Sequence, residues 1–148
     1  MPERPTEVTT EGGLDVAVQV PAIQDAIARL RDAAVRVSVF IDADPAQVLA
    51  SKRAGADAIE INTGPYAYAG ATERAGHLAR VAEAARLAAG HGLEVLAGHG
   101  LNYVNVRPIV DIAEIVEANI GHSIVARASL VGLDRAVREM VAELRRRS

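Results

Sequence analysis

Short apolar runs alternate with longer amphipathic stretches along most of the chain. Four runs rich in branched aliphatic residues predict buried strands, at 35–42, 57–64, 93–100 and 114–122. Apolar residues three and four positions apart predict helices at 21–34, 44–55, 71–92, 105–112, 122–132 and 133–147, the 105–112 segment being one or two turns. Periodicity alone leaves 122–132 ambiguous between strand and helix, and we assign it to helix because glycines punctuate both ends.

The predicted order is one helix followed by four strand–helix units. Strands that alternate with helices form parallel sheets, because parallel neighbours need a crossover connection. No linker or low-complexity tract divides the sequence, so we expect a single α/β domain over 1–148. Within it, residues 1–13 are expected to form a flexible loop or tail, and 14–148 to hold the first helix and the four βα units. The polar tract 7–16, "EVTTEGGLDV", is either a mobile lid over a substrate phosphate or an N-terminal tail.

The amino-acid composition argues against nucleic acid and membranes as binding partners. The formal net charge of −3 gives no electrostatic case for nucleic acid, and no apolar stretch approaches the roughly 20 residues of a membrane helix. Cysteine is absent, which excludes disulfides and fits a reducing compartment. With a polar N-terminus that does not resemble a signal peptide, the sequence predicts a cytoplasmic protein that binds neither nucleic acid nor membrane.

Polar residues lie where the predicted strands end. Parallel α/β folds place their catalytic and ligand-binding residues at these carboxyl ends of the strands. Glu60 alternates with Ile59 and Ile61, so its carboxylate points to the opposite face of its strand. His99 stands between two glycines, which we interpret as room for a substrate. His122 opens a predicted helix, where backbone N–H groups favour an anion.

Structural interpretations compete with these. Asp44 is read as a helix cap, with Pro45 at the first helical position and Gly55 at the stop. We assign no function to His77 or His91. Three tyrosines are expected in loops after strands, where they line a site or merely cap it: Tyr66, Tyr68 and Tyr103.

Five motifs in order resemble the pyridoxine 5′-phosphate synthase family: "EVTTEGGLDV", "VSVFIDAD", "GADAIEINTGPYA", "AGHGLNYVNV" and "NIGHSIVARA". The resemblance implies the C-terminal half of a (β/α)8 TIM barrel, assembled into a homo-oligomer. It implies condensation of 1-deoxy-D-xylulose 5-phosphate with 3-amino-2-oxopropyl phosphate to pyridoxine 5′-phosphate, in vitamin B6 synthesis. No metal or organic cofactor is implied.

The resemblance also implies residue roles. His99 matches the family's proton donor, and Glu60 matches a carboxylate that stabilises a transition state. The substrate-binding positions matched are Thr9 of a closing loop, Gly100 against the amino-ketone phosphate, and Gly121 with His122 beside a substrate phosphate.

The sequence departs from the family in two ways. Asn62 stands where relatives often have histidine, which removes a titratable group but keeps hydrogen-bonding capacity. A complete barrel takes about 250 residues, so the first four strands are expected to be missing, with their acid–base histidine and glutamate. The family usually reads Val-Pro-Glu where this chain begins Met1-Pro2-Glu3, which suggests a gene start placed at an internal valine codon, or a true truncation.

Four strands with open edges leave several alternatives. The sequence is a partial reading of a complete enzyme, or half a barrel that pairs with a second copy, or an inactive remnant. Two other functions stay open. Glu60, His99 and His122 are ligand types for a divalent metal in a hydrolase barrel. Gly121 and His122 alone would suit a non-catalytic phosphate-binding module.

Overall fold

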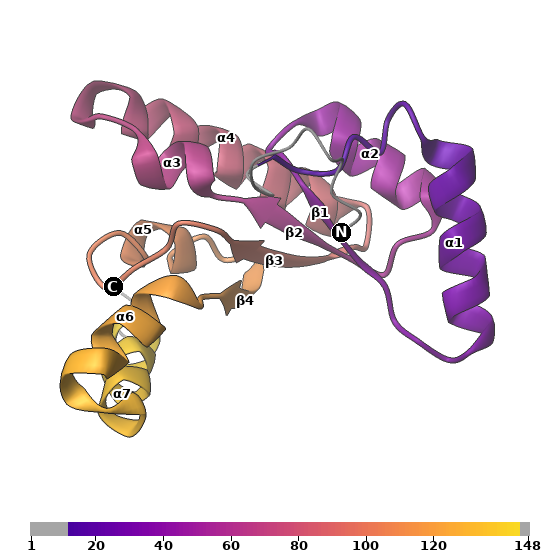
Figure 1. Cartoon of the computed structure of the whole chain (residues 1–148). Coiled ribbons are helices and arrows are strands. Elements are labelled where there is room, and N and C mark those ends of the chain that lie inside the picture. Colours follow the sequence, from indigo (N-terminus) through magenta and orange to yellow (C-terminus); the bar gives the residue numbers. More distant parts are fainter. Residues whose placement is uncertain (1–11, 146–148) are drawn as a thin grey trace, which may run out of the picture.

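The computed structural model describes residues 12–145, which form a parallel four-stranded sheet flanked by helices (Figure 1). The strands are β1 (Ser38–Ile41), β2 (Ala58–Asn62), β3 (Glu94–Gly98) and β4 (Ile115–Asn119), in the spatial order β1-β2-β3-β4. Each strand is parallel to its neighbour, as the alternating pattern predicts. This is half of the strand complement of a (β/α)8 barrel, and the predicted α/β class is confirmed.

All six predicted helical segments are present. The helices, with one addition, are α1 (Val20–Asp32), α2 (Pro45–Ala54), α3 (Gly64–Tyr68), α4 (Ala71–Gly90), α5 (Arg107–Val110), α6 (His122–Val131) and α7 (Leu133–Arg145). The sequence interpretation missed α3, because five residues are too few to show a helical period. No helix in the 12–145 portion is long and apolar enough to cross a membrane.

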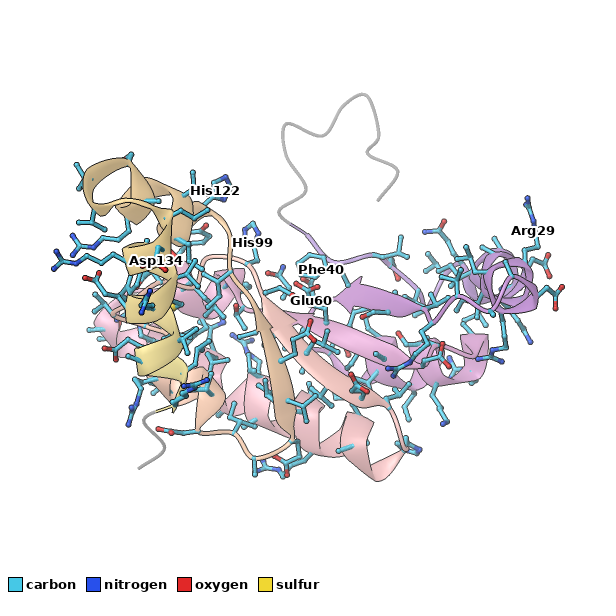
Figure 2. All side chains as sticks on the ribbon, turned by 90° about the horizontal axis from the view of Figure 1, so that it is seen from below. Arg29, Phe40, Glu60, His99, His122 and Asp134 are labelled. Carbon is cyan, nitrogen blue, oxygen red and sulfur yellow. The ribbon has the colours of Figure 1, made fainter. Side chains whose placement is uncertain are left out.

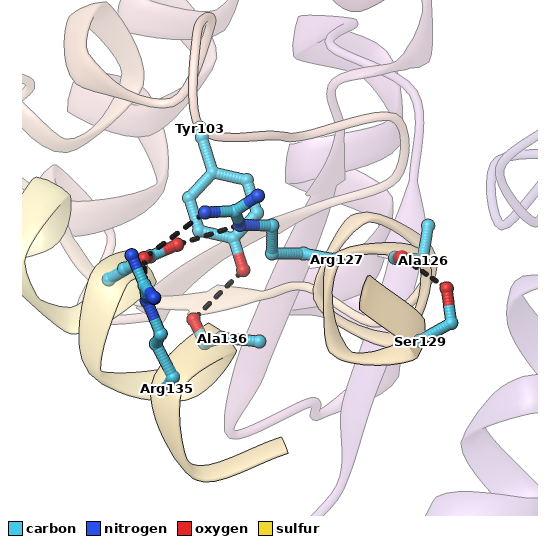
Figure 3. A network of polar contacts seen from close by, with 7 residues as sticks. Tyr103, Ala126, Arg127, Ser129, Arg135 and Ala136 are labelled. Carbon is cyan, nitrogen blue, oxygen red and sulfur yellow. Dashed lines mark hydrogen bonds and ion pairs between the residues drawn. The ribbon is translucent and has the colours of Figure 1, made fainter. Parts of the chain in front are cut away.

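Tyr66 and Tyr68 therefore lie in helix α3, and their assignment to a loop was wrong. Tyr66 is buried, and its hydroxyl donates a 2.7 Å hydrogen bond to the Asn105 carbonyl oxygen. Tyr103 does follow strand β3 in a turn, where its hydroxyl donates to the Ala136 carbonyl oxygen at 2.8 Å (Figure 3). Tyr66 and Tyr103 thus use their hydroxyl groups to tie elements of the fold together.

Local chemistry explains why α2 begins and ends where it does. The Asp44 carboxylate accepts a 2.8 Å hydrogen bond from the Ala46 N–H, which satisfies one of the free donors of the first turn. Pro45 occupies the first helical position, where no donor is lost. Gly55 ends the helix with a φ of +89°, a conformation that favours glycine. The predicted cap and stop are both confirmed.

The two faces of the sheet differ in character. Ile59 and Ile61 of β2 are fully buried in the apolar core, together with α4 residues such as Ala84 and Ala88. The alternate residue, Glu60, lies on the other face, as its position between two isoleucines predicts. There it stands in a cross-strand row that runs from β1 to β4: Phe40, Glu60, Leu96 and Glu117.

The face that carries Glu60 has no helix packed on it in the described part of the chain, because consecutive right-handed crossovers put the helices on one side. Strands β1 and β4 each pair with only one neighbour within residues 12–145, so both edges of the sheet are open there. Figure 2 shows Phe40, Glu60, His99 and His122 along one side of the molecule. This side is where the candidate site lies.

Candidate active site

His99 follows directly after strand β3, and its ring lies near two aromatic side chains. The ring centroid lies 6.4 Å from that of Phe40 and 5.9 Å from that of Tyr68, whose ring meets it edge-on. The backbone of His99 has a φ of +79°, in the left-handed region that non-glycine residues seldom adopt. The structure therefore presents the imidazole at a strand exit in an unusual but well-packed geometry.

Glu60 is half-buried on β2, and its carboxylate accepts a 2.9 Å hydrogen bond from the side-chain amide of Asn119 on β4. Burial raises the pKa of Glu60, because the charged carboxylate is poorly solvated there. The Asn119 hydrogen bond opposes this rise, while the nearby Glu117 adds to it and His99 acts against it. Sequence reasoning assigned no role to Asn119, although the residue ends its strand two positions before Gly121.

Gly98 and Gly100 are packed so closely against other residues that a side chain at either position would collide with them, which the sequence did not reveal. A Cβ on Gly98 would collide with the Glu60 carboxylate and come within 3.2 Å of the Asn119 Cβ. Gly100 has a φ of +75°, and a Cβ there would stand 2.6 Å from the Ala67 Cβ. Neighbouring groups of the protein therefore occupy the space in which a side chain at Gly98 or Gly100 would begin, while the Gly100 backbone still lines an open hollow.

His99 and the first residues of helix α6 line the same open hollow, which has a volume of about 710 Å³. Gly121 is the N-cap of α6 and supplies no side-chain cap, and the exposed His122 is its first residue. The Ser123 hydroxyl donates a 2.9 Å hydrogen bond to the Leu101 carbonyl oxygen, which ties the first turn of α6 to the chain after His99. The lining includes four predicted site residues and the newly found Asn119: His99, Gly100, Asn119, Gly121 and His122.

The remaining sequence predictions fall in different places. Asn62 is buried, with its amide nitrogen donating to the Asp42 carboxylate at 2.8 Å and its amide oxygen accepting from the Gly64 N–H at 2.9 Å. His77 contacts Arg80 on α4, and His91 is exposed at the end of that helix, so neither lines the hollow. Thr9 lies outside the described residues.

A metal site is not supported by the side-chain geometry. Within residues 12–145, no three histidine, aspartate or glutamate side chains converge closely enough to hold a metal ion. Glu60 directs its carboxylate to Asn119, while His122 sits at the start of α6 across the hollow from His99.

Comparison with known proteins agrees with this geometry. The family model described as "Pyridoxal phosphate biosynthesis protein PdxJ" matches residues 1–146. The pyridoxine 5′-phosphate synthase of Trichlorobacter lovleyi is 55% identical over 147 residues, which cover 99% of this chain and 62% of the relative. The enzymes of the same name from Idiomarina loihiensis and Pelobacter propionicus are 53% and 51% identical, over 95% of this chain and 58% and 59% of their own lengths.

The extent of these matches is itself a finding. The chain spans about three fifths of the length of the curated relatives it matches. The match is nevertheless continuous across the four βα units and includes the strand exits that form the site. By sequence and by fold, the chain belongs to the PdxJ family of pyridoxal phosphate biosynthesis proteins.

Proposed function

We propose that the site serves pyridoxine 5′-phosphate synthase chemistry. The reaction condenses 1-deoxy-D-xylulose 5-phosphate with 3-amino-2-oxopropyl phosphate, and releases inorganic phosphate and water as the pyridine ring closes. One observation carries the proposal: His99 and His122 line the same hollow as Asn119, which holds the Glu60 carboxylate. The names of the relatives support the same reaction.

His99 is the proposed proton donor. Ring closure moves several protons at carbon and oxygen atoms, and an imidazole is suited to such transfers near neutral pH. The ring lies near Phe40 and Tyr68 and lines the hollow, a position from which it can transfer a proton to a bound substrate. Glu60 is the proposed stabiliser of the transition state, with Asn119 fixing the orientation of its carboxylate.

The start of helix α6 is the proposed phosphate site. The N–H groups of a helix's first turn have no partner within the helix, and the helix dipole favours an anion there. Gly121 supplies no side-chain cap that would compete with a phosphate. Gly100 is the proposed contact to the amino-ketone phosphate, and Thr9 that to the deoxyxylulose phosphate.

We propose that the 148 residues by themselves form only one side of the catalytic site. Both sheet edges are open and the Glu60 face lacks a helical cover among the described residues, so further strands are needed to enclose a substrate. Those strands come from a longer polypeptide or from a second copy in a homo-oligomer. Light scattering on the purified chain separates these cases, since a monomer with exposed apolar surface argues against pairing. The cysteine-free sequence fits a cytoplasmic location.

The proposal is tested by assaying product formation from both substrates, with the 148-residue chain and with the chain extended by in-frame upstream coding sequence. The His99→Gln variant is expected to lose about 100-fold or more in kcat, because proton transfer loses its donor. His91→Gln is the matched control, since His91 is exposed and lies outside the hollow. Full activity of His99→Gln would refute the assignment, and binding of one substrate without turnover in either form would indicate a phosphate-binding module.

A further inference from the structure

The backbone of His99 has a positive φ angle, a conformation that is unfavourable for a residue with a Cβ atom. Among residues 12–145, only His99 and Ala34 are non-glycine residues with positive φ, at +79° and +59°. A side chain with a Cβ is disfavoured in this region, so neighbouring groups must impose it. Ala34 lies in an exposed turn, whereas His99 lies at the proposed catalytic centre.

Thr63, the residue that directly follows the neighbouring strand β2, forms hydrogen bonds on both sides of the His99 φ angle. Thr63 follows β2, and its side chain is fully buried. Its hydroxyl lies 2.8 Å from the Gly98 carbonyl oxygen and 2.7 Å from the His99 carbonyl oxygen, so one hydroxyl proton serves both acceptors. The Thr63 N–H also donates to the Gly98 carbonyl oxygen at 2.8 Å. Two consecutive carbonyl groups on either side of the His99 φ angle are thereby fixed by one residue.

Gly64, the residue after Thr63, packs against the imidazole ring of His99. A Cβ at Gly64 would stand 2.7 Å from the His99 Cδ2 atom, so the ring packs directly on the glycine backbone. Gly64 is in turn placed by its N–H bond to the Asn62 side chain. The Thr63-Gly64 pair therefore contacts both parts of His99, with the hydroxyl on its main chain and the glycine against its imidazole.

A buried hydroxyl costs free energy unless it is hydrogen-bonded, and the Gly98 and His99 carbonyl oxygens supply the partners of the Thr63 hydroxyl. We infer that Thr63 is a positioning residue, whose hydroxyl holds the Gly98 and His99 carbonyls and so aims the His99 imidazole into the hollow. Thr63 acts through His99 and does not itself line the hollow. The catalytic consequence rests on the proposed synthase function, whereas the conformational one does not.

The test compares Thr63→Val, which removes the hydroxyl but keeps the shape, with Thr63→Ser, which keeps the hydroxyl. Ser51→Ala is the matched control, because Ser51 is also fully buried and its hydroxyl donates to the Gln47 carbonyl oxygen within α2, away from the strand exits. The conformational readout is NMR of the chain with labelled histidine: the His99 ring resonances, and the intraresidue amide–Hα contact that is short only at positive φ. Thr63→Ala replaces the valine variant if that variant does not fold.

We expect Thr63→Val to shift the His99 ring resonances and weaken the short amide–Hα contact, while Thr63→Ser and Ser51→Ala leave both as in the wild type. In the form that shows synthase turnover, kcat should fall roughly 10- to 100-fold with little change in KM, and serine should restore it. The NMR readout needs no turnover, so failure of the synthase proposal leaves the inference testable. His99 signals in Thr63→Val that match those of Ser51→Ala would overturn it.

Discussion

The side chains of Asn119 and Glu60 meet across strand β3, which separates the strands that carry them, through a hydrogen bond of 2.9 Å. They meet because the β3 residue in register with Asn119 is Gly98, which places no side chain between them. A carboxylate on one strand is thus oriented by an amide two strands away. The geometry of the proposed transition-state stabiliser depends on a glycine that itself has no functional group.

Replacing Gly98 should therefore be costly. A Cβ at this position would collide with the Glu60 carboxylate, so Gly98→Ala should break the Glu60–Asn119 hydrogen bond and lower the free energy of unfolding by about 1–3 kcal/mol. The control is Gly76→Ala on the exposed face of α4, where a Cβ meets no atom within 4 Å and should add about 0.5–1 kcal/mol of helix stability. Urea denaturation measures both, and unchanged stability of Gly98→Ala would contradict the role given to Gly98.

Glu60 should make stability fall as pH rises. Its folded-state pKa is raised above the ordinary value of 4.5 by burial, so the unfolded chain loses this proton at a lower pH than the folded chain. The stabilising effect is complete below 4.5 and is lost as pH rises through the folded pKa. Glu60→Gln, whose amide oxygen still accepts from Asn119, should lack this decline. Urea titrations of both proteins across that window provide the measurement, and parallel pH profiles would show that Glu60 is not desolvated.

Much of the fold could be predicted because each cue was local. Asp44, Pro45 and Gly55 mark the ends of α2 through hydrogen bonds and dihedral angles within a few residues of each. The alternation of Glu60 with Ile59 and Ile61 likewise fixes which face it occupies. The alternation of strands and helices predicted the parallel sheet, and the consecutive strand order is that of the half barrel which the family resemblance implies.

The missed parts of the site depend on contacts between strand exits that are distant in sequence. Thr63 meets His99 across 36 positions, and Asn119 meets Glu60 across 59. No periodicity marks such pairs, and a threonine or asparagine at a strand end looks like an ordinary turn residue. The glycines around His99 were noticed, but their true neighbours, Glu60 and Ala67, become visible only in three dimensions.

The cap of α2 offers a direct check on the local part of the fold. Asp44→Ala should lower the free energy of unfolding by about 1 kcal/mol, because the Ala46 N–H loses its acceptor. Asp44→Asn should retain most of the stability, since the asparagine side-chain oxygen accepts the same hydrogen bond. Chemical denaturation of the three proteins tests this, and equal losses in both variants would mean that charge, and not the hydrogen bond, matters at this cap.

Helix α6 is anchored to α7 by an ion pair that should respond to acid (Figure 3). Arg127 of α6 donates to both carboxylate oxygens of Glu139, at 2.8 and 3.2 Å, and Arg135 donates to the same group. These guanidinium groups lower the pKa of Glu139 to about 2. Because the folded-state pKa is depressed, the stability it contributes is present above 4.5 and is lost as pH falls toward 2.

Glu139→Gln should accordingly be less stable than the wild type at neutral pH, and the difference should shrink on acidification because the wild type then loses its charged partner. Since the two side chains stay 36% and 32% exposed to solvent, the effect should be modest and should weaken further in high salt. Glu83→Gln on α4 controls for the loss of a surface carboxylate. Thermal unfolding across pH, followed by circular dichroism, separates the variants. A stability gap between wild type and Glu139→Gln that stays constant down to the lowest pH would show that the ion pair does not hold α6 against α7.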